Sequence, residues 1–179
     1  MMAAHGLAST QSGFALPQLE NPSEEFNLTK EEGSWFASIF IIGFIFGSVA
    51  GSLESKMLGR KKTIWINSIS YIIVNFVLAS CSNLTILLLT RFLLGMVSTS
   101  ATIALLMYCG EITQAKVRQI TGSFSGFFFA FGCVIGLTLG AILPWRWAFA
   151  VGNIVPICCA VCMILTLQKC RRRRKILEL

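Results

Sequence analysis

The sequence predicts an all-α integral membrane protein. Of its 179 residues, 55% are hydrophobic and only 13% are charged, and the mean hydropathy is +0.73. These values lie outside the usual range of soluble domains. Between Glu32 and Lys169 the chain is a series of long uncharged runs, and its few charges lie mostly between them. A soluble bundle built from such runs would need helices that are apolar on every face, which is rare.

Five of these runs have the length of about 20 residues that a helix needs to cross the hydrocarbon core of a bilayer. Residues 1–19 are only moderately apolar, lack a basic leader segment, and are too short to span comfortably. We interpret them as the outer part of a first helix whose inner part is absent, and residues 169–179 as a basic tail. The five complete spans are expected at residues 33–53, 64–80, 86–108, 120–143 and 147–168.

Basic residues are concentrated in every second loop of this arrangement. Lys56 and Arg60–Lys62 follow the first complete span, Lys116 and Arg118 follow the third, and Lys169–Lys175 follows the fifth. The positive-inside rule therefore places these loops and the tail in the cytoplasm. The net charge of +7 comes largely from these loops and the tail. At that surface the basic residues are attracted to anionic lipid headgroups. We therefore expect the lipid bilayer as a partner and do not expect nucleic acid.

The same orientation makes residues 20–32 an extracellular loop. This loop contains Asn27-Leu28-Thr29, the acceptor pattern for N-glycosylation, so Asn27 is a candidate glycosylation site. We expect a multi-pass integral membrane protein, with the plasma membrane as its location; no retention signal in the sequence distinguishes this membrane from an internal one.

Small residues recur at four-residue spacing on two of the expected helices. Such stripes let helices approach closely where no hydrophobic effect drives them together. The spacing leaves open whether the stripes serve static packing or the sliding of helices that transporters require. One span carries Gly43, Gly47 and Gly51, and another carries Gly122, Gly126 and Ala130 followed by Gly132, Gly136 and Gly140.

The sequence offers no set of residues for catalysis or metal binding. Its single histidine is His5, so the usual general base of hydrolytic enzymes is missing from the expected spans. Cys158, Cys159 and Cys162 share one span with no histidine or carboxylate nearby, and we interpret them as small apolar residues. We expect neither an enzyme nor a bound cofactor or metal.

Charged residues on the predicted cytoplasmic side form a second pattern. Gly59 permits a tight chain reversal immediately before Arg60 and Lys61. Glu111 and Arg118 are seven residues apart, which puts them on one face of a continuing helix. Arg60 in the neighbouring loop can reach Glu111. The cluster is either a solvated helix end or a latch whose ion pairs form in one conformation and break in another.

Four motifs occur in the order and at the loop positions of a known family. Through them the chain, from Gly6 to Leu167, resembles the N-terminal half of a sugar porter of the major facilitator superfamily, most closely the insect facilitated trehalose and hexose transporters. The motifs are Gly59-Arg60-Lys61, Arg91-Phe-Leu-Leu-Gly95, Tyr108-Cys-Gly-Glu111-Ile-Thr-Gln-Ala-Lys-Val-Arg118 and Pro144-Trp-Arg-Trp147.

The resemblance implies a six-helix half with a truncated first helix, and a cytoplasmic gating network of Arg60, Lys61, Glu111 and Arg118. The chain also departs from the family. Lys56 stands where the family has an acidic residue, with Glu54 displaced upstream, and Gly126 stands where the family has a sugar-contacting glutamine. Residues 1–19 contain no acid, so the proton-coupling aspartate of symporters is not visible, which favours facilitated diffusion.

The family has twelve helices in two halves, with substrate bound between the halves, whereas this chain ends after the sixth. We interpret it as a truncated half of a carrier that moves trehalose or a hexose by facilitated diffusion, through alternating access. Such a half would pair with a second half or with a copy of itself. The alternative is a non-transporting membrane protein that associates with full-length carriers through its glycine stripes.

Overall fold

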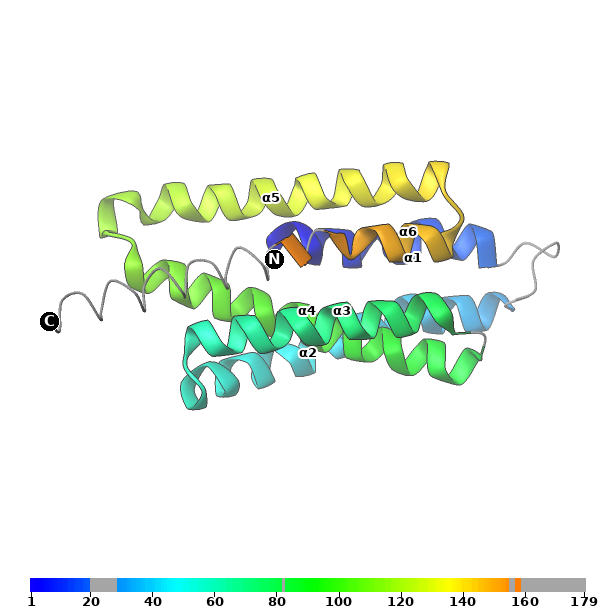
Figure 1. The fold of residues 1–179 in the computed structure, drawn as a ribbon, viewed down its shortest axis with the longest axis horizontal. Helices are drawn as coiled ribbons and strands as arrows, with labels where there is room; N and C mark the ends of the chain where they lie inside the picture. Colours follow the sequence, from blue (N-terminus) through cyan, green and yellow to red (C-terminus); the bar gives the residue numbers. More distant parts are fainter. Residues whose placement is uncertain (20–28, 82, 155–156, 159–179) are drawn as a thin grey trace, which may run out of the picture.

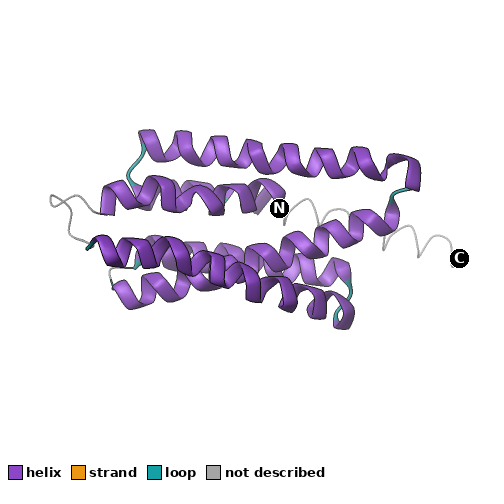
Figure 2. Cartoon of the chain, turned by 180° about the vertical axis from the view of Figure 1, so that it is seen from behind, coloured by secondary structure: helices purple, strands orange, loops and turns teal. Residues whose placement is uncertain are grey.

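The computed structural model describes residues 1–19, 29–81, 83–154 and 157–158. The described residues form helices joined by short turns and contain no strand, so the predicted all-α class is confirmed (Figure 2). The helices are α1 (Met2–Leu19), α2 (Lys30–Met57), α3 (Arg60–Ser80), α4 (Leu84–Ile112), α5 (Ala115–Ile142) and α6 (Trp145–Gly152).

Four of these helices are long and apolar enough to cross a membrane: α2, α3, α4 and the Arg118–Ile142 part of α5. They overlap the expected spans 33–53, 64–80, 86–108 and 120–143 and extend a few residues beyond most of their ends. The expected span at 147–168 begins in α6 and continues outside the described residues. The 18-residue helix α1 is not among the membrane-length helices.

The helices lie side by side along one long axis (Figure 1). Helix α2 packs on α4, and α3 packs on α4 and α6. Helix α1 lies between α5 and the group formed by α2, α3 and α4, and it also contacts α6. Figure 1 shows that α1 begins partway along α5, so the N-terminal half of α5 extends beyond the start of α1.

Glycines set the distance between α2 and α4. A Cβ added at Gly47 would lie 2.7 Å from the Cα of Met96, and one at Gly51 would lie 2.6 Å from the Cα of Ser100. Gly43 faces the backbone carbonyl of Phe92, and Gly95 of α4 faces the carbonyl of Phe40 in return. Both backbones are therefore in direct contact over about three turns, which only residues without a side chain allow.

The glycines of α5 divide into two groups. Gly132 and Gly136 approach α1 at Ala3 and Leu7, respectively, and a Cβ at Gly132 would lie 2.7 Å from the Cα of Ala3. Around Gly122 and Gly126, by contrast, no described atom lies within 4 Å of where a Cβ would be. Among the described residues, packing against α1 thus occupies only the second of the two stripes.

The exterior of the bundle is apolar, unlike that of a soluble protein, and polar side chains are buried in its interior alongside a hydrophobic core. On α2 the buried face carries glycines, Ser55 and two phenylalanines, while Ile41, Ile45 and Val49 on the outer face are each more than half exposed. Polar side chains such as Gln11 and Asn75 are fully buried between helices. This arrangement suits a bilayer, where lipid surrounds the apolar faces and polar groups must find partners inside.

The turns have identifiable causes. Gly59, the residue with positive φ (82°) among those described, reverses the chain between α2 and α3, as its sequence position predicts. Thr29 and Glu32 form a capping box that starts α2. Gln18 of α1 fixes the α5–α6 turn, because its Nε2 donates to the carbonyl of Gly140 (3.0 Å) and its Oε1 accepts from the backbone N–H of Trp145 (2.7 Å).

The packing of α2 on α4 gives a testable prediction. Replacing Gly47 with alanine should lower the free energy of unfolding by about 1–3 kcal/mol, because the added methyl group forces the helices apart. The matched variant Gly126→Ala should leave stability unchanged or slightly raised, since its methyl group meets no described atom. Thermal unfolding in detergent, followed by tryptophan fluorescence, measures both. Equal destabilisation by the two variants would contradict the close contact.

Candidate functional site

An ion pair joins the α2–α3 turn to the end of α4. The Nε and Nη2 atoms of Arg60 both lie 2.8 Å from Oε1 of Glu111, and Nη1 of Arg60 donates to the backbone carbonyl of Ser55 at 2.8 Å. The side chains are 30% and 54% exposed. An ion pair with this much contact with solvent typically contributes no more than about 1 kcal/mol, so it can form and break readily.

The other residues of the predicted gating network lie at the same end of the bundle, which we call the basic end. Lys61 places its Nζ 5.5 Å from the ring centroid of Tyr108 on α4, a cation–π distance. Arg118 donates from Nη2 to the carbonyl of Gly110 at 3.2 Å. Among the described residues, the ion pair at this end joins Arg60 with Glu111, while Arg118 bridges the α4–α5 turn.

The resemblance implies an acidic residue at the position of Lys56, beside the α2–α3 turn. The nearest acid in this chain, Glu54, lies two residues earlier and has different contacts. It points away from the turn and accepts hydrogen bonds at Oε2 from Nδ2 of Asn67 (2.9 Å) and from Oγ of Ser100 (2.8 Å). Asn67 also donates to Ser100 at 2.8 Å. The three side chains connect α2, α3 and α4, while Lys56, which occupies the family's acidic position, is exposed.

A second polar cluster surrounds Arg91, whose side chain is fully buried. Its Nη1 donates to Oε1 of Gln11 (2.6 Å) and to the backbone carbonyl of Ala8 (3.2 Å). The guanidinium carbon lies 4.9 and 4.8 Å from the ring centroids of Phe36 and Phe40. Nε and Nη2 have no hydrogen-bond partner among the described residues, so the aromatic faces supply the remaining electrostatic contact with the cation.

The partners of Arg91 lie on α1 and α2, and α1 is bonded in turn to α3. Gln11 of α1 donates from Nε2 to Oδ1 of Asn75 on α3 at 3.0 Å. Tyr71, one turn earlier on α3, donates its hydroxyl to the carbonyl of Ala4 at 2.9 Å. The cluster ties α1 to α3 and α4 deep in the bundle. Sequence reasoning did not find it, although a charged residue inside an apolar run signals that polar partners must exist.

Neither cluster has the composition of a catalytic or metal site. Among the described residues, no group of three or more histidine, cysteine or acidic side chains could hold a metal ion. Both clusters are suited to fixing helices relative to one another. The glycosylation candidate Asn27, together with Cys159 and Cys162, lies outside the described residues.

The sequence matches known transporters over nearly its whole length. The profile of the family described as "Sugar (and other) transporter" matches residues 3–168. The chain is 28% identical over 161 residues to the facilitated trehalose transporter Tret1 of Drosophila yakuba and 30% identical over 163 residues to that of Polypedilum vanderplanki. It is 30% identical over 149 residues to the solute carrier family 2, facilitated glucose transporter member 6 of Mus musculus.

These alignments cover most of this chain and a smaller part of each relative. They include 89%, 90% and 83% of the chain, respectively, but only 19%, 32% and 30% of the relatives. The chain therefore spans about a fifth to a third of the length of these relatives.

The two kinds of polar contact at the basic end should differ in strength. Replacing Asn67 with leucine leaves the half-buried Glu54 without one donor and should lower the free energy of unfolding by about 1–3 kcal/mol. Glu111→Gln removes only an exposed ion pair and should cost less than about 1 kcal/mol. Thermal unfolding in detergent compares the variants, and equal midpoints would show that the Glu54 contacts do not stabilise the fold.

Proposed function

The chain belongs to the family of sugar (and other) transporters, and from that premise we propose that it forms one half of a facilitated carrier for trehalose or a hexose. The carrier works by alternating access, in which two halves rock around a substrate site between them. The named relatives carry out facilitated trehalose or glucose transport, and we extend that activity to this chain. We place the protein in the plasma membrane, with the basic end facing the cytoplasm.

The environment of Arg91 supports facilitated movement of sugar without coupling to protons. Coupling requires a group that gains and loses a proton inside the membrane, and such groups are usually carboxylates or histidines. Arg91 bonds instead to the neutral amide of Gln11 and to the carbonyl of Ala8. Among the described residues, the acidic side chains are Glu31, Glu32, Glu54 and Glu111, all within about a turn of a helix end. The histidine, His5 of α1, lies against the rings of Phe44 and Phe129 with no hydrogen-bond partner at Nδ1 among the described residues.

The open surface of α5 supports pairing with a second half. Phe124, Phe127 and Phe131 of α5 are each more than half exposed, and Gly126 lies between the first two in the sequence. Small residues beside large apolar ones are typical of surfaces where membrane helices pack closely. We expect the second half to cover this part of α5.

Transport by co-expressed halves tests the proposal. We expect proteoliposomes to take up radiolabelled trehalose or glucose when they hold this chain together with the C-terminal half of the Polypedilum vanderplanki transporter. Uptake should stop at equal concentrations and should not change when an inward proton gradient is imposed, because Arg91 pairs with a neutral amide. Protein-free liposomes are the control for passive entry.

The other outcomes of this experiment separate the rival interpretations. Uptake by the chain alone would indicate a homodimer of halves. Accumulation driven by the proton gradient would contradict the facilitated mechanism. Co-purification with a full-length carrier, with no uptake when the chain is paired with a C-terminal half, would favour the non-transporting interaction protein.

The latch role of the Arg60–Glu111 pair gives a separate prediction. In the co-expressed carrier, Glu111→Gln should change the uptake rate by about fivefold, the effect of about 1 kcal/mol on the balance between two conformations. Membrane insertion should not change, since the ion pair is exposed. The matched variant Glu31→Gln removes an exposed carboxylate at the opposite end of α2 and should have no effect. Equal uptake by wild type and Glu111→Gln would exclude the latch.

A further inference from the structure

The buried guanidinium of Arg91 has one edge that makes no hydrogen bond to the described residues. Its Nη1 donates to Gln11 and to the carbonyl of Ala8, whereas Nε and Nη2 are buried without a hydrogen-bond partner there. The N–H groups of these two nitrogens point the same way, which suits a shared acceptor. Arg60 uses the same pair of nitrogens to bind Glu111. We call this pair on Arg91 the Nε/Nη2 edge.

The positive charge of Arg91 is also unbalanced within the part of the chain that the structure describes. No ion pair in this part includes Arg91, and its partner Gln11 is a neutral amide. Between residues 33 and 110 the sequence contains one acid, Glu54, which accepts its hydrogen bonds from Asn67 and Ser100. A charge inside a membrane protein is costly unless an opposite charge accompanies it.

The aromatic rings beside Arg91 offset only part of this cost. The ring centroids of Phe36 and Phe40 lie 4.9 and 4.8 Å from the guanidinium carbon, and the negative faces of such rings attract a cation. A ring carries no full charge, so it does not neutralise the guanidinium. Both phenylalanines are buried, so they also shield the Nε/Nη2 edge from water.

We propose that the Nε/Nη2 edge of Arg91 binds one small monovalent anion, which is chloride under physiological conditions. Two buried donors on one edge require an acceptor, and a chloride ion accepts from both N–H groups at once. One negative charge balances the guanidinium, whereas a divalent anion such as sulfate would leave an excess charge inside the membrane. A water molecule would accept the same hydrogen bonds but would leave the cation unbalanced.

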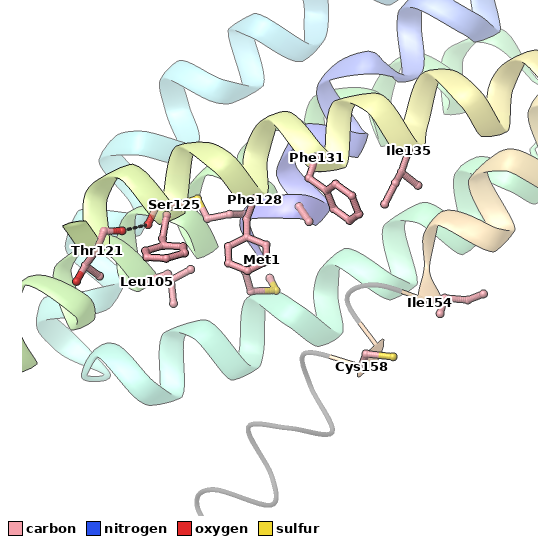
Figure 3. Close-up of a pocket in the computed structure, with 12 residues that line it drawn as sticks. Met1, Leu105, Thr121, Ser125, Phe128, Phe131, Ile135, Ile154 and Cys158 are labelled. Carbon is pink, nitrogen blue, oxygen red and sulfur yellow. Dashed lines mark hydrogen bonds between the residues drawn. The ribbon is translucent and has the colours of Figure 1, made fainter. Parts of the chain in front are cut away.

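The location of Arg91 makes this a structural ion between helices. Arg91 is seven residues from the start of α4 at Leu84, about 10 Å along the helix and at the end opposite the basic end. The apolar cavity beside α5 in Figure 3 is lined by Phe128 and Ile135, among others, but not by Arg91. The ion would therefore stabilise the contact of α1 with α4. This inference does not depend on sugar transport.

The dependence of stability on chloride tests the proposal. The full chain in detergent is unfolded by heat at constant ionic strength, with chloride replaced stepwise by gluconate, and is followed by circular dichroism. Chloride at about ten times its dissociation constant should raise the unfolding midpoint by about 3–6 °C, the shift that accompanies a tenfold change in the folding equilibrium of a chain of this size. Bromide should act like chloride. Equal midpoints in chloride and gluconate would overturn the proposal and would indicate water at the Nε/Nη2 edge.

Two matched variants distinguish binding at Arg91 from a general effect of salt. Gln11→Glu replaces the amide that accepts from Nη1 with a carboxylate, so the charge is balanced within the chain and the midpoint should no longer depend on chloride. Gln18→Glu makes the same chemical change further along α1, where the side chain bonds to the α5–α6 turn, and should keep the full response. Loss of the response in both variants, or its retention in both, would contradict binding at Arg91.

Crystals of the full chain grown in bromide locate the ion directly. We expect an anomalous peak within hydrogen-bond distance of Nε and Nη2 of Arg91 in the wild type, and no peak at that place in Gln11→Glu. Bromide found only at other positions, or the same peak in both proteins, would overturn the assignment. Because stability and ion position are the readouts, these results do not depend on whether the chain moves sugar.

Discussion

Two helices in a bilayer gain little from burying apolar side chains against each other, because lipid is an equally apolar partner. Their association depends on how closely the backbones approach and on the polar contacts that follow. In this protein the contact of α2 with α4 meets that condition through Gly43, Gly47 and Gly51 on one side and Gly95 on the other. Larger residues at these positions would separate the helices and would move the groups at their ends apart.

The register of that contact sets the geometry of the basic end. With Gly51 against Ser100, the next turn of α2 brings Glu54 within 2.8 Å of the Ser100 hydroxyl. The chain then reverses at Gly59, and Arg60 meets Glu111 almost three turns further along α4. The buried hydrogen bonds and the exposed ion pair are thus successive consequences of one helix contact. A shift of α2 by one residue would break both.

The sequence predicted the membrane-length helices, the close packing of α2 and the meeting of Arg60 with Glu111, because each depends on local spacing or on adjacent loops. It did not predict which stripe of α5 is covered, since Gly122 and Gly132 begin similar patterns and only the position of α1 decides between them. It also missed the partners of Arg91. Gln11 is 80 residues from Arg91 in the sequence and 64 residues from Asn75, to which it donates, and the angle at which the helices pack determines that they meet.

The burial of α1 explains why it can carry several amide and hydroxyl side chains. A helix surrounded by other helices has little contact with lipid, so its hydroxyl and amide groups can bond to neighbours without exposure to hydrocarbon. Gln11 bonds to Asn75 and Arg91, and Gln18 bonds to the α5–α6 turn. These ties hold α1 to α3, α4 and α5 at its middle and at its C-terminal end. A carrier that rocks between two states needs each half to move as a rigid body, so its reversible contacts must lie on the surface. The Arg60–Glu111 pair joins two parts of this same chain but is exposed enough to exchange partners, which is the role we propose for it, whereas the buried clusters hold the helices together.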